Sequence, residues 1–220
     1  MPNTAKGVRL PEIIENPNGL YEGDLKSYFA IFLLAKNLYN PYHNFRHIIH
    51  VVWLCYNACI YYREILTGRE MRNLLIAAIF HDYNHRGRTS DDDLNIELAI
   101  RALKKHILEQ DRRFFDEIVE LMRATKFPYD TKSRDLSLSA QILRDADSSQ
   151  GLSPVWVQQI VFGLSAEMDI TPVKMLREQE LFFRRLEFTT DWAKKEFPQS
   201  LIEERIAEAR ALLPYFPNGR

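Results

Sequence analysis

Helical spacing of apolar residues recurs along the whole chain, and no segment alternates strictly as a half-buried strand does. Glycine is scarce, with 8 among 220 residues, where a typical chain has about 7%. Few glycines allow few tight turns, so the pattern favours helices over a sheet sandwich. The expected helices cover about 24–39, 43–65, 70–81, 90–106, 112–126, 134–145, 153–168, 172–188 and 199–213. The fold is therefore predicted to be all-α.

The length and the absence of linkers predict one compact domain over residues 1–220. Residues 1–22 contain three prolines and are expected to be an irregular lead-in. Residues 214–220 are expected to be a loose tail.

The charged residues nearly balance, with 29 Lys and Arg against 30 Asp and Glu. Nucleic-acid polymers and anionic membranes favour a marked basic excess in their partners, so we expect neither. The longest apolar run, Leu74–Phe80, is far shorter than the roughly 20 residues that span a bilayer. No signal-peptide pattern is present, and Cys55 and Cys59 lie in an apolar segment typical of buried free thiols. These features predict a cytoplasmic protein.

Five of the six histidines lie in one stretch of the sequence. His43, His47 and His50 are spaced by four and three residues, so a helix would place them on one face. His81 and His85 follow at the end of the most apolar expected helix. A single histidine on an apolar face is more often a core residue, but a core cannot bury five imidazoles without partners. Imidazole with carboxylate is the ligand set of Zn, Mn, Fe or Co, with Mg tolerated where carboxylate and water dominate.

Adjacent His81 and Asp82 would point about 100° apart within a helix, so they can meet one ion only where the helix ends. A further ligand must then come from a distant segment. Asp145 and Asp147 stand near the end of another expected helix, where carboxylates oppose the macrodipole. This position favours a role in metal binding, and a solvated helix end is the simpler alternative.

These residues resemble the HD superfamily of metal-dependent phosphohydrolases, whose His-Asp pair corresponds to His81-Asp82. The order of five short motifs is similar to that of the class I cyclic nucleotide phosphodiesterases, and some motifs resemble small predicted bacterial HD hydrolases. The motifs are Tyr42-His43-Asn44-x-x-His47, His81-Asp82-x-x-His85-x-Gly87, Glu97-Leu98-Ala99, Ala124-Thr125-Lys126 and Ala146-Asp147-Ser148. The resemblance covers a motif core of about 42–150 and implies a helical HD-domain, phosphodiesterase-like fold.

The resemblance also implies a role for each matching residue. The implied metal ligands are His47, His81, Asp82 and Asp147, with Asp82 bridging to a second ion where two are bound. His43 would be the general acid that protonates the leaving oxygen, and His85 would lie beside it in the catalytic pocket. Asn44 would orient His43 or bind phosphate, with a plain helix cap as the alternative.

Three positions depart from the phosphodiesterase pattern, because His50, Asn84 and Lys126 stand where those enzymes carry aspartate. The cleft is expected to be less acidic, which puts a second metal in question and favours a more highly charged phosphate substrate. The expected phosphate-binding residues are Lys126, Arg86, Arg88 and Arg46, each with a solvated surface charge as the alternative.

Gln179 and Phe182 have the spacing of the glutamine and phenylalanine with which those phosphodiesterases select purines. Gln179 is therefore a candidate for contacting a nucleotide base, although such a pair is common by chance.

The predicted function is hydrolysis of a phosphate ester of a small nucleotide-like substrate by a metal-activated water. The alternative is a non-catalytic regulatory HD module that binds a metal and a nucleotide. The residues leave open which phosphate bond is cut, which divalent metal is bound and whether one or two ions bind. They also leave open the oligomeric state and the role of the C-terminal third.

Overall fold

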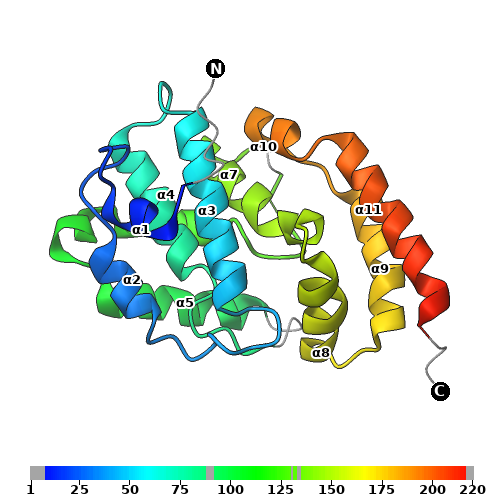
Figure 1. Ribbon diagram of the computed structural model, residues 1–220. Coiled ribbons are helices and arrows are strands. Elements are labelled where there is room, and N and C mark those ends of the chain that lie inside the picture. Colours follow the sequence, from blue (N-terminus) through cyan, green and yellow to red (C-terminus); the bar gives the residue numbers. More distant parts are fainter. Residues whose placement is uncertain (1–7, 88–91, 130, 133–134, 217–220) are drawn as a thin grey trace.

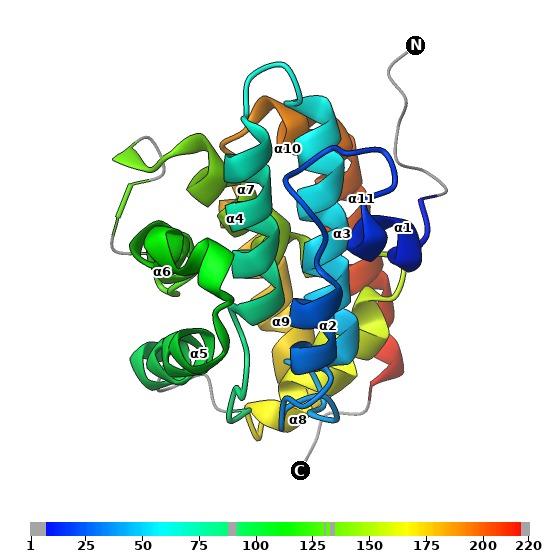
Figure 2. The same ribbon diagram turned by 90° about the vertical axis from the view of Figure 1, so that its left-hand side faces the viewer.

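The computed structural model describes residues 8–87, 92–129, 131–132 and 135–216. These residues form helices and no strand, which confirms the all-α prediction (Figures 1 and 2). The α-helices are α1 (Leu10–Glu15), α2 (Lys26–Phe32), α3 (Phe45–Tyr61), α4 (Gly68–Phe80), α5 (Asp92–His106), α6 (Phe115–Arg123), α7 (Leu138–Ser148), α8 (Ser165–Glu167), α9 (Pro172–Arg185), α10 (Asp191–Glu196) and α11 (Gln199–Leu212). The other helices are 3₁₀ helices η2 (Glu109–Phe114), η4 (Ser149–Leu152) and η6 (Leu213–Tyr215) and a π-helix, η5 (Val157–Leu164). None of the helices in these ranges is both long and apolar enough to cross a bilayer.

Helix α4 is the buried centre of the fold, as its apolar second half predicts. A capping box starts it, because Thr67 Oγ1 accepts from the Glu70 N–H and the Glu70 carboxylate accepts from the Thr67 N–H. Every side chain from Met71 to Phe80 is buried, and α4 packs against α3, α6 and α7. Since the helix ends inside the core, the residues that follow Phe80 are buried as well.

The C-terminal third forms a second layer beside this core. Helices α9 and α11 lie side by side at one edge of the molecule (Figure 1). The π-helix η5 packs against α9, and its Gly163 meets the loop before α3. A Cβ at Gly163 would lie 2.5 Å from the carbonyl oxygen of Pro41, so this close approach requires glycine. The approach brings the second layer against the segment that carries His43.

The lead-in predicted to be irregular contains a helix. Helix α1 occupies Leu10–Glu15, and Pro11 stands in its first turn, where the missing N–H costs no hydrogen bond. Ile13 and Tyr21 are buried, and the Tyr21 hydroxyl donates to the Ile13 carbonyl. Residues 1–7 and 217–220 lie outside the described ranges, and of the expected tail the first residues belong to η6.

The helix predicted over 24–39 ends early, because α2 stops at Phe32. A buried asparagine in the following turns explains the difference. The Asn37 amide donates to the carbonyls of His43 and Asp82 at 2.8 and 2.9 Å, and its oxygen accepts from the Asn84 N–H. These long-range hydrogen bonds join the two segments that carry the histidines and override local helix propensity.

A buried ion pair joins η2 to α4. The Arg72 guanidinium makes two 2.7 Å hydrogen bonds to the Asp111 carboxylate, and both side chains are almost fully buried. Tyr28 and Arg69 donate to the same carboxylate. Burial alone would raise the pKa of Asp111, but the hydrogen bonds from Arg72, Arg69 and Tyr28 lower it overall.

Replacing Asp111 with alanine is expected to lower the free energy of unfolding by about 3–5 kcal/mol, because it leaves the buried Arg72 charge without its partner. The exposed Glu120→Ala is the control and should change stability by less than about 0.5 kcal/mol. The pKa of Asp111 is depressed by folding, so its contribution is complete above the unfolded value of about 3.9 and declines as the pH falls below it. Urea denaturation at pH 7 and pH 3.5 measures the unfolding free energy of each variant. Equal losses of unfolding free energy in Asp111→Ala and Glu120→Ala would contradict this role of Asp111. A loss in Asp111→Ala that is larger at pH 3.5 than at pH 7 would contradict it as well.

Candidate metal centre and pocket

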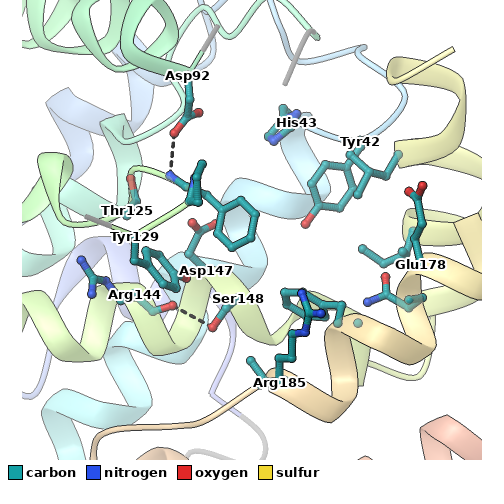
Figure 3. Close-up of a pocket in the computed structure, with 18 of the residues that line it drawn as sticks. Tyr42, His43, Asp92, Thr125, Tyr129, Arg144, Asp147, Ser148, Glu178 and Arg185 are labelled. Carbon is teal, nitrogen blue, oxygen red and sulfur yellow. Dashed lines mark hydrogen bonds between the residues drawn. The ribbon is translucent and has the colours of Figure 1, made fainter. Parts of the chain in front are cut away.

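A pocket of about 950 Å³ opens between the two layers (Figure 3). The loop before α3 and the ends of α4 and α7 supply Tyr42, His43, Asp82 and Asp147 to its wall. The opposite wall comes from η5, α8 and α9. The pocket therefore joins the predicted motif core to the C-terminal third.

The four predicted metal ligands converge at this pocket. His47, His81, Asp82 and Asp147 place one ligand atom each within 4.8 Å of all the others. His47 Nε2 lies 3.2 Å from Asp82 Oδ2 and 3.1 Å from Asp147 Oδ1. His81 Nε2 lies 3.2 Å from the same oxygen of Asp82. Ligands from three helices thus surround one point.

The ends of α4 and α7 explain how these side chains meet. His81 is the C-cap of α4 and Asp82 follows it, so the two adjacent side chains are free of helical geometry and turn to one side. Asp147 stands in the last turn of α7, and His47 in the first turn of α3. Asp145, the other carboxylate of that segment, is used elsewhere, because it accepts from the backbone of Thr189 and Thr190.

The ring of His81 shows that the cluster suits a cation. Its Nδ1 lies 2.9 Å from the Ala78 carbonyl oxygen, which only accepts, so Nδ1 carries the proton and Nε2 presents a lone pair. That Nε2 is 3.4 Å from His47 Nε2. The buried Asp82 Oδ2 lies 3.2 Å from the Nε2 atoms of both His47 and His81, and no described residue forms a well-aligned hydrogen bond to it. Imidazole nitrogens and carboxylate oxygens that converge on one point are the ligand set of a divalent ion.

The charge of the cluster leads to the same conclusion. Burial alone would lower the pKa of His47, but the carboxylates of Asp147 and Asp82 raise it to about 9. Burial alone would also lower the pKa of His81, but the carboxylates of Asp82 and Asp147 raise it overall. The site attracts positive charge, so a metal ion must displace protons in order to bind.

His43 lies before α3, which corrects the prediction that three histidines share one helix face. Helix α3 begins at Phe45, and its N-cap is Asn44, whose oxygen accepts from the N–H groups of Arg46 and His47. The Asn44 amide donates to two carbonyls of the preceding turn. No polar atom of Asn44 is left for a phosphate, so the cap, the alternative stated above, is its role.

Glu167 of α8 fixes the orientation of His43. Its Oε2 accepts from His43 Nδ1 at 2.7 Å, and its Oε1 accepts from the N–H groups of Tyr42 and His43 at 2.7 and 2.8 Å. Burial alone would raise the pKa of Glu167, but the hydrogen bonds from His43 and Tyr42 lower it overall. An ionised carboxylate only accepts, so His43 Nδ1 carries a proton and Nε2 is the ring nitrogen available to the pocket.

The imidazole ring of His85 packs against that of His43. The two rings stack with centroids 3.6 Å apart. His85 Nδ1 accepts from the Gly87 N–H, and its Nε2 lies 2.9 Å from the Asn95 amide nitrogen. Burial lowers the pKa of His85 to about 4, so the ring is neutral at pH 7. His85 lies beside His43, as the resemblance implied, but it does not line the large pocket, and its catalytic role stays a prediction.

His43, Asp82 and His85 form a second group with metal-ligand spacing. Glu167 already uses His43 Nδ1, and both nitrogens of His85 have contacts. The first group, with four ligands, is therefore the better metal site.

Lys126 and Arg86, which are predicted to bind phosphate, are not among the residues that line the large pocket. Lys126 Nζ is 2.8 Å from the Asp93 carboxylate, because the acidic start of α5 attracts it. Arg86 borders a smaller, separate pocket with Lys36. Neither residue lines the large pocket, so a contact of either with the substrate stays a prediction, and Arg88 lies outside the described residues.

Gln179 and Phe182 both line the pocket from α9. The Gln179 side chain is 5% exposed and forms no hydrogen bond with a described residue. A nearly buried amide without a partner at a pocket wall is free to bind a polar ligand edge.

Sequence reasoning missed Glu167 and Asn37. Glu167 meets His43 across a separation of 124 residues and stands in no recognisable motif. An isolated glutamate or asparagine in a polar segment carries no local signal, so only the tertiary structure reveals these two partners.

Comparisons with known proteins agree with this geometry. The family model of the 3′5′-cyclic nucleotide phosphodiesterases matches residues 42–123. No curated protein matches the chain significantly. The structure is similar to the phosphodiesterase domain of the RhoPDE fusion protein from the choanoflagellate Salpingoeca rosetta, with a TM-score of 0.62 and 16% identity, over 93% of this chain and 87% of that one. These matches confirm the predicted resemblance and the phosphodiesterase-like fold, and the family match and the ligand cluster support a metal-dependent phosphoric ester hydrolase.

Proposed function

We propose that this chain, which resembles the HD-superfamily phosphodiesterases, hydrolyses a small nucleotide-like phosphodiester with a divalent cation held by His47, His81, Asp82 and Asp147. One observation carries the proposal: four ligand atoms within 4.8 Å of one another lie beside a His43–Glu167 pair on the wall of one pocket. A purely structural cluster has no need of the oriented imidazole, and a purely binding site has no need of a proton donor.

A divalent ion bound there would supply Lewis acidity and an activated water at neutral pH. The chain itself supplies the proton for the leaving group. His43 Nε2 faces the pocket while Glu167 holds Nδ1, so a protonated His43 can donate to the departing oxygen and remain paired with the carboxylate. His85 stacks on one face of the His43 ring and restrains its rotation.

The wall opposite the ligand cluster suits a nucleotide base. Gln179 offers an amide donor and acceptor, and Phe182 and Ile160 offer apolar surface. The matched family model describes enzymes of cyclic nucleotides, which supports this substrate class. The buried free thiols Cys55 and Cys59 support a reducing compartment, and we propose the cytoplasm.

Metal analysis and ester hydrolysis test the proposal on the wild-type protein. We expect near-stoichiometric divalent metal and turnover of bis-(p-nitrophenyl) phosphate that stops with a chelator and returns with Mn²⁺ or Zn²⁺. A panel of cyclic and linear nucleotides would then identify the bond that is cut. Nucleotide binding without product in any of several metals would instead support the regulatory module, and a chelator without effect on stability or activity would contradict the metal site.

A further inference from the structure

Helix α9 presents a cation to the pocket. Gln179, Phe182 and Arg185 recur at intervals of three residues and all line the pocket. Arg185 stands in the last turn of α9, and its side chain rises from the helix into the pocket (Figure 3). It comes from the same helix as the proposed base-binding residues, and it lines the same pocket as Asp147 and Ser148.

Arg185 is a cation with no ion-pair partner among the residues that the structure describes. It is exposed and forms no ion pair with a described residue. Its neighbour Arg184 contrasts with it, because the Arg184 guanidinium donates to the Glu180 carboxylate at 2.9 Å. The pocket wall also carries Glu178 and Glu187, and Glu178 pairs with Lys174 rather than with Arg185.

The other arginine that lines the pocket, Arg144, already has hydrogen-bond partners. Arg144 is buried, donates to the carbonyls of Ala124 and Thr131, and lies 4.1 Å over the Tyr129 ring. Lys126 is paired with Asp93. Arg185 is thus the one guanidinium or ammonium group among the described lining residues that is free to receive an anion.

The pocket is large for a small-molecule site. Its volume of about 950 Å³ lies at the upper end of the range for small-molecule sites, about 300–1,000 Å³. The metal centre accounts for the reacting phosphate, so a free guanidinium elsewhere on the wall implies a second anionic group on the ligand. Arginine suits phosphate, because its planar fork donates two hydrogen bonds to one group.

We propose that Arg185 binds a second phosphate, remote from the bond that is cut, and that the substrate is a nucleotide phosphodiester carrying that second phosphate. The inference rests on the proposed function and narrows its substrate class. A dinucleotide and a terminally phosphorylated nucleotide share this chemistry.

The test compares two esters that differ only in the remote phosphate: thymidine 5′-(p-nitrophenyl phosphate) and its 3′-phosphorylated form. We expect the wild-type kcat/KM to favour the 3′-phosphorylated ester by about tenfold, the size of one charge-assisted hydrogen-bonded contact. Arg185→Ala should remove the preference, Arg185→Lys should retain part of it, and Arg184→Ala should keep it whole. The ratio of the two esters within each protein cancels any general loss of activity.

A binding measurement separates this inference from the proposed function. Calorimetry with Mn²⁺ present should show thymidine 3′,5′-bisphosphate binding about tenfold more tightly than thymidine 5′-monophosphate, with the difference lost in Arg185→Ala. Failure of the protein to hydrolyse either ester would count against the proposed function, while the calorimetric ratio would still decide the role of Arg185. The inference is overturned if the wild type shows no preference in either assay, or if Arg185→Ala keeps the preference.

Discussion

Replacing Asp147 with asparagine is expected to remove most of the bound metal and to lower hydrolysis by about a thousandfold. The carboxylate lies 3.1 Å from His47 Nε2, inside the four-ligand cluster. Lewis-acid catalysis contributes several kcal/mol to a phosphoryl reaction, which corresponds to a factor of this size. Metal content by elemental analysis and turnover of bis-(p-nitrophenyl) phosphate measure the two effects.

Asp145→Asn is the matched control for Asp147, because it changes a carboxylate two positions away on the same helix. Asp145 accepts from Thr189 and Thr190 rather than pointing at the cluster. We expect Asp145→Asn to lower the unfolding free energy while the metal content stays normal. Loss of metal in both variants, or in neither, would contradict the assignment of Asp147 as a ligand.

Metal affinity should also rise with pH. The pKa of His47 is raised to about 9 in the metal-free cluster, so at pH 7 a proton occupies the place of the ion. Protons compete less as the pH rises toward 9, and the apparent metal affinity should increase over that interval. A metal titration at pH 6, 7 and 8 checks the sign.

Replacing His43 with alanine is expected to cost about 10² to 10⁴ in kcat for an ester whose leaving group is an alkoxide. The loss should be much smaller for a p-nitrophenyl ester, because p-nitrophenolate departs without protonation. Metal content should be unchanged, since His43 Nδ1 is paired with Glu167 and His43 is outside the four-ligand group. Rates for both esters, measured with the same enzyme, isolate the proton donation.

Two further variants sharpen the test of His43. Glu167→Gln should lower the rate for the alkoxide ester less than His43→Ala, because a neutral amide holds His43 Nδ1 less firmly than the carboxylate does. His106→Ala, which changes a histidine on α5 remote from the pocket, is the control and should leave both rates unchanged. An equal loss of rate for both esters in His43→Ala would contradict the role of general acid.

Much of the site was predictable because its ligands stand in short motifs. Spacing and residue type indicated a metal site at His81 and Asp82, and the resemblance supplied His47 and Asp147 as partners. The placement of Asp82 could be reasoned from the end of a helix, since a residue beyond the C-cap is free of helical geometry. The choice between Asp145 and Asp147 as ligand came from the resemblance alone, and the structure shows the physical distinction in their hydrogen bonds.

Other features were not predicted, for reasons that are partly distant and partly local in the sequence. Lys126 was expected at the substrate, but Asp93 on α5 attracts it. His43 was expected on a helix, but the Asn44 cap starts the helix after it. Helix α10 was not predicted, and the π-helix η5 was read as part of an ordinary helix, because local periodicity does not separate the two.

Periodicity predicted the helices, and short motifs with the family resemblance predicted a candidate metal cluster of two imidazoles and two carboxylates, because both signals are local in the sequence. The groups that surround this cluster became visible in the tertiary structure. Packing of η5 against the loop before α3 brings Glu167 to His43, and packing of α9 brings Arg185 to the same pocket. Such contacts join segments more than a hundred residues apart, and their free energy comes from burial and hydrogen bonds that no local pattern records.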